Sequence, residues 1–187
     1  GSGKSTLLAK LASEIRGTGK RVGIVAVDPS SPFSGGSILG DRIRMSELTE
    51  DPGIFVRSMA SRGEMGGLAR GTLDAVDILD AAGYGTVLIE TVGVGQDEIE
   101  VVQAAHTIVV ISAPGLGDEI QAVKAGVLEI ADIHVVSKCE RSDANRTVID
   151  LKNMLSMNTA PADPSGWKTP VVSTSAEKGE RFDLLRR

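Results

Sequence analysis

Cysteine, aromatic residues and long apolar runs are all scarce in this sequence, and each scarcity excludes a class of protein. The single cysteine, Cys139, rules out an internal disulfide and a thiolate-rich zinc site, and it fits a reducing cytoplasm. Aromatic residues are 3 % of the chain, so the core must be built from Val, Ile, Leu and Ala. No apolar run reaches the ~18 residues of a membrane-spanning helix, and no secretory signal pattern is visible. We therefore expect a cytoplasmic protein, or one of the mitochondrial matrix in a eukaryote, with no membrane partner.

An excess of positive charge is also missing. The chain carries 20 Lys and Arg against 25 Asp and Glu, which gives a net charge of −5. A protein that binds nucleic acid neutralises phosphates with clustered basic side chains. The short basic clusters at residues 42–44 and 181–187 lie beside acids, and the second cluster fits a solvated face. The composition therefore argues against a nucleic-acid partner.

Short apolar runs alternate with amphipathic segments along the 187 residues. The predicted strands cover residues 21–27, 54–59, 86–89, 107–112, 133–137 and 171–173. The predicted helices cover residues 4–16, 42–48, 67–82, 97–104, 118–130, 145–157 and 182–185. In the helix predicted over 67–82, the residues expected to face inward are Leu68, Leu73, Val76 and Leu79. Strands alternating with helices predict an α/β fold with a mostly parallel sheet and helices on both faces.

The chain opens with GSGKST, which matches the end of the phosphate-binding pattern G-x-x-x-x-G-K-[ST]. In such a P-loop, backbone N–H groups and a helix N-terminus converge on phosphate oxygens. The first glycine of the pattern would precede Gly1. We therefore expect residues 1–187 to be a single P-loop NTPase domain that lacks its first strand and is truncated at both ends. The residues assigned to phosphate binding are Gly1, Ser2, Gly3, Lys4, Ser5 and Thr6.

A triphosphate bound in a P-loop needs Mg²⁺, which prefers hard oxygen ligands. The Ser5 hydroxyl is the first candidate ligand. Three acids follow predicted strands or glycine-rich loops and are further candidates: Asp28, Asp41 and Glu90. Each of the three acids also fits an ordinary helix cap or a solvated loop residue. In an open α/β sheet, ligands bind at the carboxyl ends of the strands, where these acids are predicted to lie.

The sequence Glu90-Thr91-Val92-Gly93 is typical of a nucleotide switch, in which the glycine N–H contacts the γ-phosphate. The loop over residues 29–41 is long for a simple connection between two elements, and it is the candidate for the first switch along the chain. Val94, which follows the switch glycine, has an apolar side chain that cannot orient a water molecule. We therefore expect slow intrinsic hydrolysis, accelerated when a partner orders the switches.

Ser137-Lys138-Cys139-Glu140 follows a predicted strand at the place where guanine-binding proteins carry Asn/Thr-Lys-x-Asp. The carboxylate of that motif accepts hydrogen bonds from guanine, and Glu140 offers the same group on a longer stem. Later, Ser175-Ala176 is similar to the element whose backbone N–H contacts the guanine 6-oxygen. Together these residues predict GTP or GDP as the ligand, with a weakened guanine preference. The alternative for residues 137–140 is a surface strand end.

Three further segments, together with the P-loop, resemble one known family. They read VDPSSPFSGGSILGDRIRM at 27–45, ETVGVGQDE at 90–98 and GDEIQAVKAGVLEIAD at 117–132. These segments are similar to those of the MeaB/ArgK-like GTPases, which are G-protein chaperones of adenosylcobalamin-dependent methylmalonyl-CoA mutase related to the human MMAA protein. The resemblance runs from residue 1 to about residue 179. The family usually has Asn-Lys-Ala-Asp where this chain has SKCE.

The resemblance implies a GTP-binding and GTP-hydrolysing chaperone. Its role would be to gate cofactor loading of a B12-dependent acyl-CoA mutase and to protect that enzyme from inactivation. A homodimer is implied for the full-length protein. Mg²⁺ would be held by Ser5, Asp28, Asp41 and Glu90. The catalytic residues implied are Lys4, Glu90, Gly93 and the switch residue Lys124.

Two other functions fit parts of the sequence. A P-loop kinase or ATPase linked to lysine, arginine and ornithine transport would share the phosphate site, but it needs no base-reading motif at residues 137–140. A nickel-insertion GTPase would need Cys and His ligands at a useful spacing. Cys139, His106 and His134 are scattered and do not supply them, and both histidines are predicted to be structural.

Overall fold

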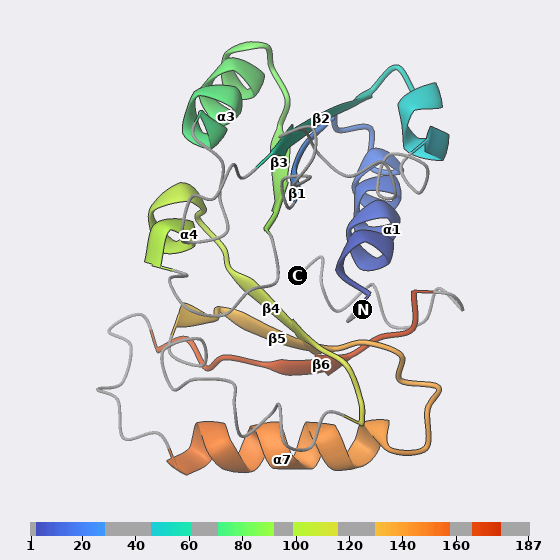
Figure 1. Cartoon of the computed structure of the whole chain (residues 1–187), viewed down its shortest axis with the longest axis vertical. Coiled ribbons are helices and arrows are strands. Elements are labelled where there is room, and N and C mark those ends of the chain that lie inside the picture. Colours follow the sequence, from blue (N-terminus) through green and yellow to red (C-terminus); the bar gives the residue numbers. More distant parts are fainter. Residues whose placement is uncertain are drawn as a thin grey trace. The chain divides into compact units, whose positions relative to one another are not determined.

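The computed structural model describes residues 3–28, 46–60, 71–91, 99–115, 130–157 and 166–176 (Figure 1). The chain divides into two compact units. The first unit is Ser5–Ala105, and the second combines Gly1–Lys4 with His106–Arg187. Each unit has its own three-stranded sheet, and every described strand pair is parallel.

The sheet of the first unit has the order β2-β1-β3. Its central strand is β1 (Val22–Asp28), which pairs with β2 (Ile54–Ala60) and β3 (Thr86–Glu90). Val22 aligns with both Ile54 and Thr86, so the three strands start level. Residues 22–27 of β1 are all buried. This explains why β1 reads as a continuous apolar run, since a central parallel strand is covered on both faces.

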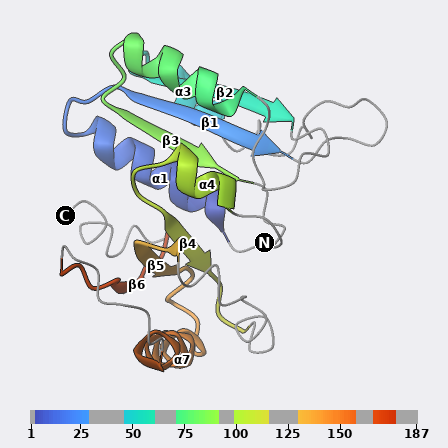
Figure 2. The same ribbon diagram turned by 90° about the vertical axis from the view of Figure 1, so that its left-hand side faces the viewer.

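Helices cover both faces of this sheet, with α1 (Lys4–Arg16) and α3 (Thr72–Ala81) on opposite sides (Figures 1 and 2). The residues of α1 that pack against β1 are spaced at helical intervals, and the cluster they form contains Leu8, Ala12, Val22, Ile24 and Ala26. On the other face, the side chain of Leu79 lies against Gly23. The short helix α4 (Ile99–Ala104) packs on the same face as α3, because its Val101 contacts the cluster around Val27.

The sheet of the second unit has the order β4-β5-β6, with β5 (Ile133–Val136) between β4 (Val109–Ser112) and β6 (Val171–Ser173). The helix α7 (Ala144–Met157) packs on one face of this sheet. Its Leu151 is fully buried against Val136. The hydrophobic residues that complete this cluster are Val148, Met154 and Val171.

The predicted α/β fold with parallel strands is confirmed, and all six predicted strands are present with their ends shifted by at most two residues. The sequence predicted one sheet, whereas the described strands form two three-stranded sheets, one in each unit. A 3₁₀ helix, η1 (Ser46–Glu50), overlaps the end of the helix predicted over 42–48. The helices predicted over 118–130 and 182–185 lie, apart from residue 130, outside the described residues.

One predicted packing face was wrong. Leu73 was expected to face inward, but it is 51 % exposed, whereas Thr72 is buried. The helix starts at Thr72, after Gly71 in a left-handed conformation. Thr72 and Leu79 are two turns apart, so they define the buried face and Leu73 lies one step round the helix. Within the described parts of the chain, no helix is long and apolar enough to cross a membrane.

Candidate nucleotide-binding site

Ser5 and Glu90 meet at the carboxyl edge of the first unit's sheet. Ser5 lies in the first turn of α1, and Glu90 is the last residue of β3. The Ser5 hydroxyl donates a 2.6 Å hydrogen bond to Oε1 of Glu90. The sequence placed Glu90 in the turn after the strand, but it belongs to β3, where it pairs with Ala26 of β1. The strand backbone therefore fixes the position of its carboxylate.

The Glu90 side chain is an unusual group to bury. Only 9 % of this residue is exposed. Burying a carboxylate is costly unless it is hydrogen-bonded, paired with a cation or used as a metal ligand. The Ser5 hydroxyl supplies one hydrogen bond, and a hydroxyl beside a carboxylate is a donor set that suits Mg²⁺. The residues present therefore fit the predicted metal.

The N-terminus of α1 is suited to an anion. The first turn of α1 contains no acidic residue, so no side-chain carboxylate competes with a phosphate for the partial positive charge of the helix end. Gly3, directly before α1, has φ of 82°. This left-handed conformation favours glycine, and it turns the chain into the helix.

Gly3 also lies next to the predicted base-binding motif, within the second unit. A Cβ atom on Gly3 would stand 3.9 Å from both Cβ and Oγ of Ser137. A side chain at position 3 would therefore contact the first residue of the Ser137–Glu140 motif. These two segments, predicted separately from the sequence, are neighbours in the fold.

The ends of all three strands of the second unit are tied together at the base-binding motif. Ser137 donates to the Ser112 carbonyl from its backbone N–H at 2.9 Å and from its hydroxyl at 3.2 Å. The Cys139 N–H donates to the Thr174 carbonyl at 3.0 Å. The two predicted base-binding elements, at residues 137–140 and 175–176, are thus joined by a backbone hydrogen bond. Ser175 is buried, and Glu140 is exposed.

Lys138 has a left-handed backbone, with φ of 54°, and is the one described residue other than glycine with a positive φ. Such a conformation is uncommon for a residue with a Cβ and often marks a functional turn. It arises where the chain leaves β5 and turns back toward α7. No pattern in the sequence predicts this conformation.

Several predicted site residues cannot be compared with the structure. Gly1, Ser2, Asp41, Gly93 and Lys124 lie outside the described residues, and for Asp28 only the backbone, at the end of β1, is described. Their roles remain predictions. Among the described site residues, Thr6 lies in α1 and Ala176 lies in the turn after Ser175. His134 is fully buried in β5, whereas His106 is exposed and precedes β4 instead of opening it.

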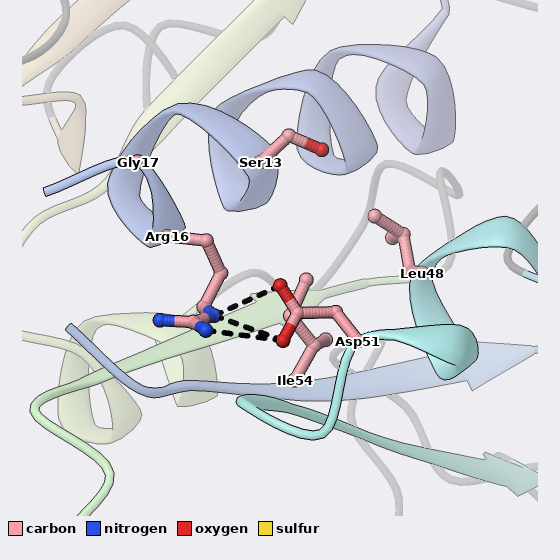
Figure 3. Close-up of a pocket in the computed structure, with 6 residues that line it drawn as sticks. All are labelled: Ser13, Arg16, Gly17, Leu48, Asp51 and Ile54. Atoms are coloured by element: carbon pink, nitrogen blue, oxygen red, sulfur yellow. Dashed lines mark hydrogen bonds and ion pairs between the residues drawn. The ribbon is translucent and has the colours of Figure 1, made fainter. Parts of the chain in front are cut away.

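A pocket of about 300 Å³ lies elsewhere in the first unit, near the C-terminus of α1 and the start of β2 (Figure 3). Its main polar feature is a fork between Arg16 and Asp51, with Nε to Oδ2 at 3.0 Å and Nη2 to Oδ1 at 3.1 Å. The fork lowers the pKa of Asp51, helped by the Gly53 N–H. This pocket is at the amino ends of the strands, opposite to the edge where α/β sheets bind ligands. We therefore assign the Arg16–Asp51 pair a structural role.

Comparison with known proteins bears directly on this site. The profile of the family described as "Methylmalonyl Co-A mutase-associated GTPase MeaB" matches residues 1–187. The chain belongs to the MeaB family. A protein of Pyrococcus horikoshii is 51 % identical over 96 % of this chain and 57 % of its own length. The Escherichia coli protein named "GTPase ArgK" is 41 % identical over 99 % of the chain and 56 % of its own length.

A mitochondrial mouse protein named as a methylmalonic aciduria type A homolog is 37 % identical over 96 % of the chain and 44 % of its own length. Among solved structures, one titled as an LAO/AO transport system kinase superposes with a TM-score of 0.74 at 24 % identity, over all of this chain and 53 % of that one. That likeness shows the P-loop fold. The predicted family is therefore confirmed. The chain spans about half the length of the relatives it matches.

Proposed function

We propose that this MeaB-family chain binds GTP with Mg²⁺ and hydrolyses it slowly. The observation that carries this proposal is the Ser5–Glu90 hydrogen bond at the carboxyl edge of the sheet. It brings the P-loop hydroxyl and a buried strand-end carboxylate within 2.6 Å, although 85 positions separate them in the sequence. Few functions other than phosphate and metal binding account for this pairing beside a GKS sequence.

In this proposal the phosphates lie against the backbone N–H groups before α1, with the Lys4 ammonium on the β- and γ-phosphates. Mg²⁺ would be held by Ser5, Glu90, Asp28 and Asp41, and when bound it would neutralise charge on the transferring phosphoryl group. The Gly93 N–H contacts the γ-phosphate. Because phosphoryl transfer depends mainly on positioning and electrostatic stabilisation, these groups account for hydrolysis without a covalent step.

Turnover is slow in this account because no side chain next to Gly93 can orient the attacking water. The neighbour is Val94, an apolar residue. A partner that orders the switch residues, Lys124 among them, would accelerate hydrolysis. The guanine base is read by Lys138, Glu140 and the Ser175–Ala176 turn, which the Cys139 N–H ties together.

We further propose that the full-length protein is a homodimeric chaperone of an adenosylcobalamin-dependent acyl-CoA mutase of the methylmalonyl-CoA mutase type. It would gate cofactor loading and protect the mutase, in the cytoplasm or in the mitochondrial matrix. Support comes from the family, whose description names the mutase, and from the similarity to the mouse methylmalonic aciduria type A homolog.

Two measurements on the full-length protein test the proposed nucleotide and the proposed partner separately. Competition between GTP and ATP for the site tests the nucleotide: we expect GTP to win, and tighter ATP binding would favour a kinase or transport ATPase. Pull-down with and without a non-hydrolysable GTP analogue tests the partner. We expect a B12-dependent mutase to co-purify in a nucleotide-dependent manner, and its absence in both conditions would contradict the chaperone role.

A further inference from the structure

The turn that follows Glu140 contains a bidentate ion pair that has no role in the nucleotide binding proposed above. Arg141 donates from Nε to Oδ1 of Asp143 at 3.0 Å and from Nη2 to Oδ2 at 2.9 Å. Two parallel hydrogen bonds fix the relative orientation of a guanidinium and a carboxylate, as a single contact cannot. This pair, the Arg141–Asp143 fork, lowers the pKa of Asp143, so the Asp143 carboxylate stays charged at neutral pH.

Backbone hydrogen bonds make this fork part of the base-binding turn. The Arg141 N–H donates to the Lys138 carbonyl at 3.0 Å, which closes the turn around Cys139 and Glu140. On its other side, the Asp143 carbonyl accepts the Thr147 N–H at 3.3 Å in the first turn of α7. The fork therefore connects the turn that carries Lys138 and Glu140 to a helix that is anchored by the buried Leu151.

The same fork packs against the end of the neighbouring strand. Gly115, three residues after β4, has φ of 86°. A Cβ atom at this position would stand 3.0 Å from Arg141 Nη2 and 3.0 Å from Asp143 Oδ2. A Cβ atom would therefore crowd the ends of both side chains by a few tenths of an ångström, and the φ of Gly115 favours glycine. The Gly115 turn thus forms a surface on which the fork rests.

We propose that Arg141 is a positioning residue for base recognition: with Asp143, it holds the Lys138–Glu140 turn against the Gly115 turn, so that the Glu140 carboxylate is placed for guanine. This inference rests on the proposed function. It accounts for how a motif with Ser and Glu, in place of the usual Asn and Asp, keeps a defined geometry. Glu140 has a longer and more flexible side chain than Asp, so a rigid turn on its C-terminal side limits where the carboxylate can lie.

Global stability is a poor explanation of the fork. The Arg141 side chain is 50 % exposed and that of Asp143 is 35 % exposed. Ion pairs this accessible to water contribute little to folding free energy. A bidentate pair with this exposure still fixes the relative orientation of its two side chains, and this is the property that the positioning role uses.

The test compares GDP with IDP, which lacks the 2-amino group that a carboxylate at position 140 would bind. Both nucleotides share the same ribose and phosphates, so the ratio of their dissociation constants reports on base contact alone. In the wild-type full-length protein we expect GDP to bind roughly 10- to 100-fold more tightly, as for a hydrogen bond to a charged group. In Arg141→Ala we expect this ratio to fall to about threefold or less.

A matched control is available in α7. Arg146 and Asp150 form an exposed ion pair, with Arg146 Nε 4.0 Å from Asp150 Oδ2 and the arginine side chain 88 % exposed. Arg146→Ala removes the same charge and side chain close to the turn, and it should leave the GDP/IDP ratio at its wild-type value. Asp143→Asn keeps the shape of its side chain and is a milder second variant. It should lower the ratio in the same direction even if Arg141→Ala folds poorly.

The outcomes are distinct. A wild-type ratio near one would overturn the assignment of Glu140 to guanine, and the positioning role of Arg141 with it. A wild-type ratio above ten that is unchanged in both Arg141→Ala and Asp143→Asn would overturn the positioning role alone. Equal weakening of GDP and IDP in the variants would also overturn it, because this would indicate a general structural effect. The proposal is supported if the GDP/IDP ratio falls in the variants while the affinity that comes from the phosphates is retained.

Discussion

The Ser5 hydroxyl donates a 2.6 Å hydrogen bond to Glu90, which joins the first turn of α1 to the last residue of β3. Ser5→Ala and Glu90→Gln should each lower the rate of GTP hydrolysis by ~100-fold or more, as for other groups that stabilise transition-state charge. Both variants should also require a higher Mg²⁺ concentration for half-maximal rate. Steady-state phosphate release in a Mg²⁺ titration measures both effects.

Asp77→Asn is the control for this prediction, because Asp77 is an exposed acid on α3. It should leave both the rate and the Mg²⁺ dependence unchanged. Wild-type Mg²⁺ dependence in Glu90→Gln would show that Glu90 does not take part in binding the metal.

The Arg16–Asp51 fork should make the stability of the protein depend on acid pH. The fork and the Gly53 N–H lower the pKa of Asp51 in the folded state. The unfolded value is about 3.9, so the stabilisation is present above that pH and is lost as pH falls through the lower folded pKa. Asp51→Asn should therefore lose less stability than wild type between neutral pH and pH 3, as measured by thermal unfolding. An equal loss of stability in Asp51→Asn and in wild type over this pH range would contradict the contribution of the fork.

Gly23 in β1 is a site where a single methyl group should disturb the core. A Cβ atom there would stand 2.8 Å from Cδ1 of the buried Leu79. Gly23→Ala should lower the free energy of unfolding by about 1–3 kcal/mol through overpacking, as measured by urea denaturation. Gly85→Ala is the matched control, since nothing lies within 4 Å of its added Cβ. An equal effect of the two substitutions would contradict the close packing of α3 on β1.

Leu151 is the central core residue of α7 and is fully buried. Leu151→Ala should lower the free energy of unfolding by about 2–5 kcal/mol, because it removes apolar contacts and leaves a cavity. Ile149→Ala, in the same helix but at a residue that is 57 % exposed, should change it by less than about 0.5 kcal/mol. Similar losses at both positions would contradict the packing of α7 on β5 and β6.

The strand and helix pattern could be predicted from the sequence because each apolar run had the length of one strand or helix and was bounded by turn residues. The strand predicted over residues 86–89 and the helix predicted over residues 4–16 were identified in this way. The position of both at one edge of the sheet followed from the rule that ligands bind at the carboxyl ends of parallel strands. The inward face of α3 was mispredicted at Leu73 because this residue is apolar, although helical spacing places it one step round the helix from the buried face that Thr72 and Leu79 define.

Features that depend on side-chain geometry or on tertiary contacts could not be predicted from the sequence. The Arg16–Asp51 and Arg141–Asp143 forks need side-chain geometry that composition does not encode. The left-handed Lys138 arises from the hydrogen bonds that tie the strand ends together. The family motifs predicted that residues 137–140 matter, but the support of this turn by Gly115 appears only in three dimensions.

The central claim is that the chain binds a guanine nucleotide through its P-loop with Lys4 on the phosphates. Equilibrium binding of GTP in the presence of Mg²⁺, measured for the full-length wild-type protein and for Lys4→Ala, tests this claim most directly. Loss of a charge-assisted contact to phosphate should weaken GTP binding by roughly 10- to 100-fold. An unchanged dissociation constant in Lys4→Ala, in a variant that remains folded, would contradict the account.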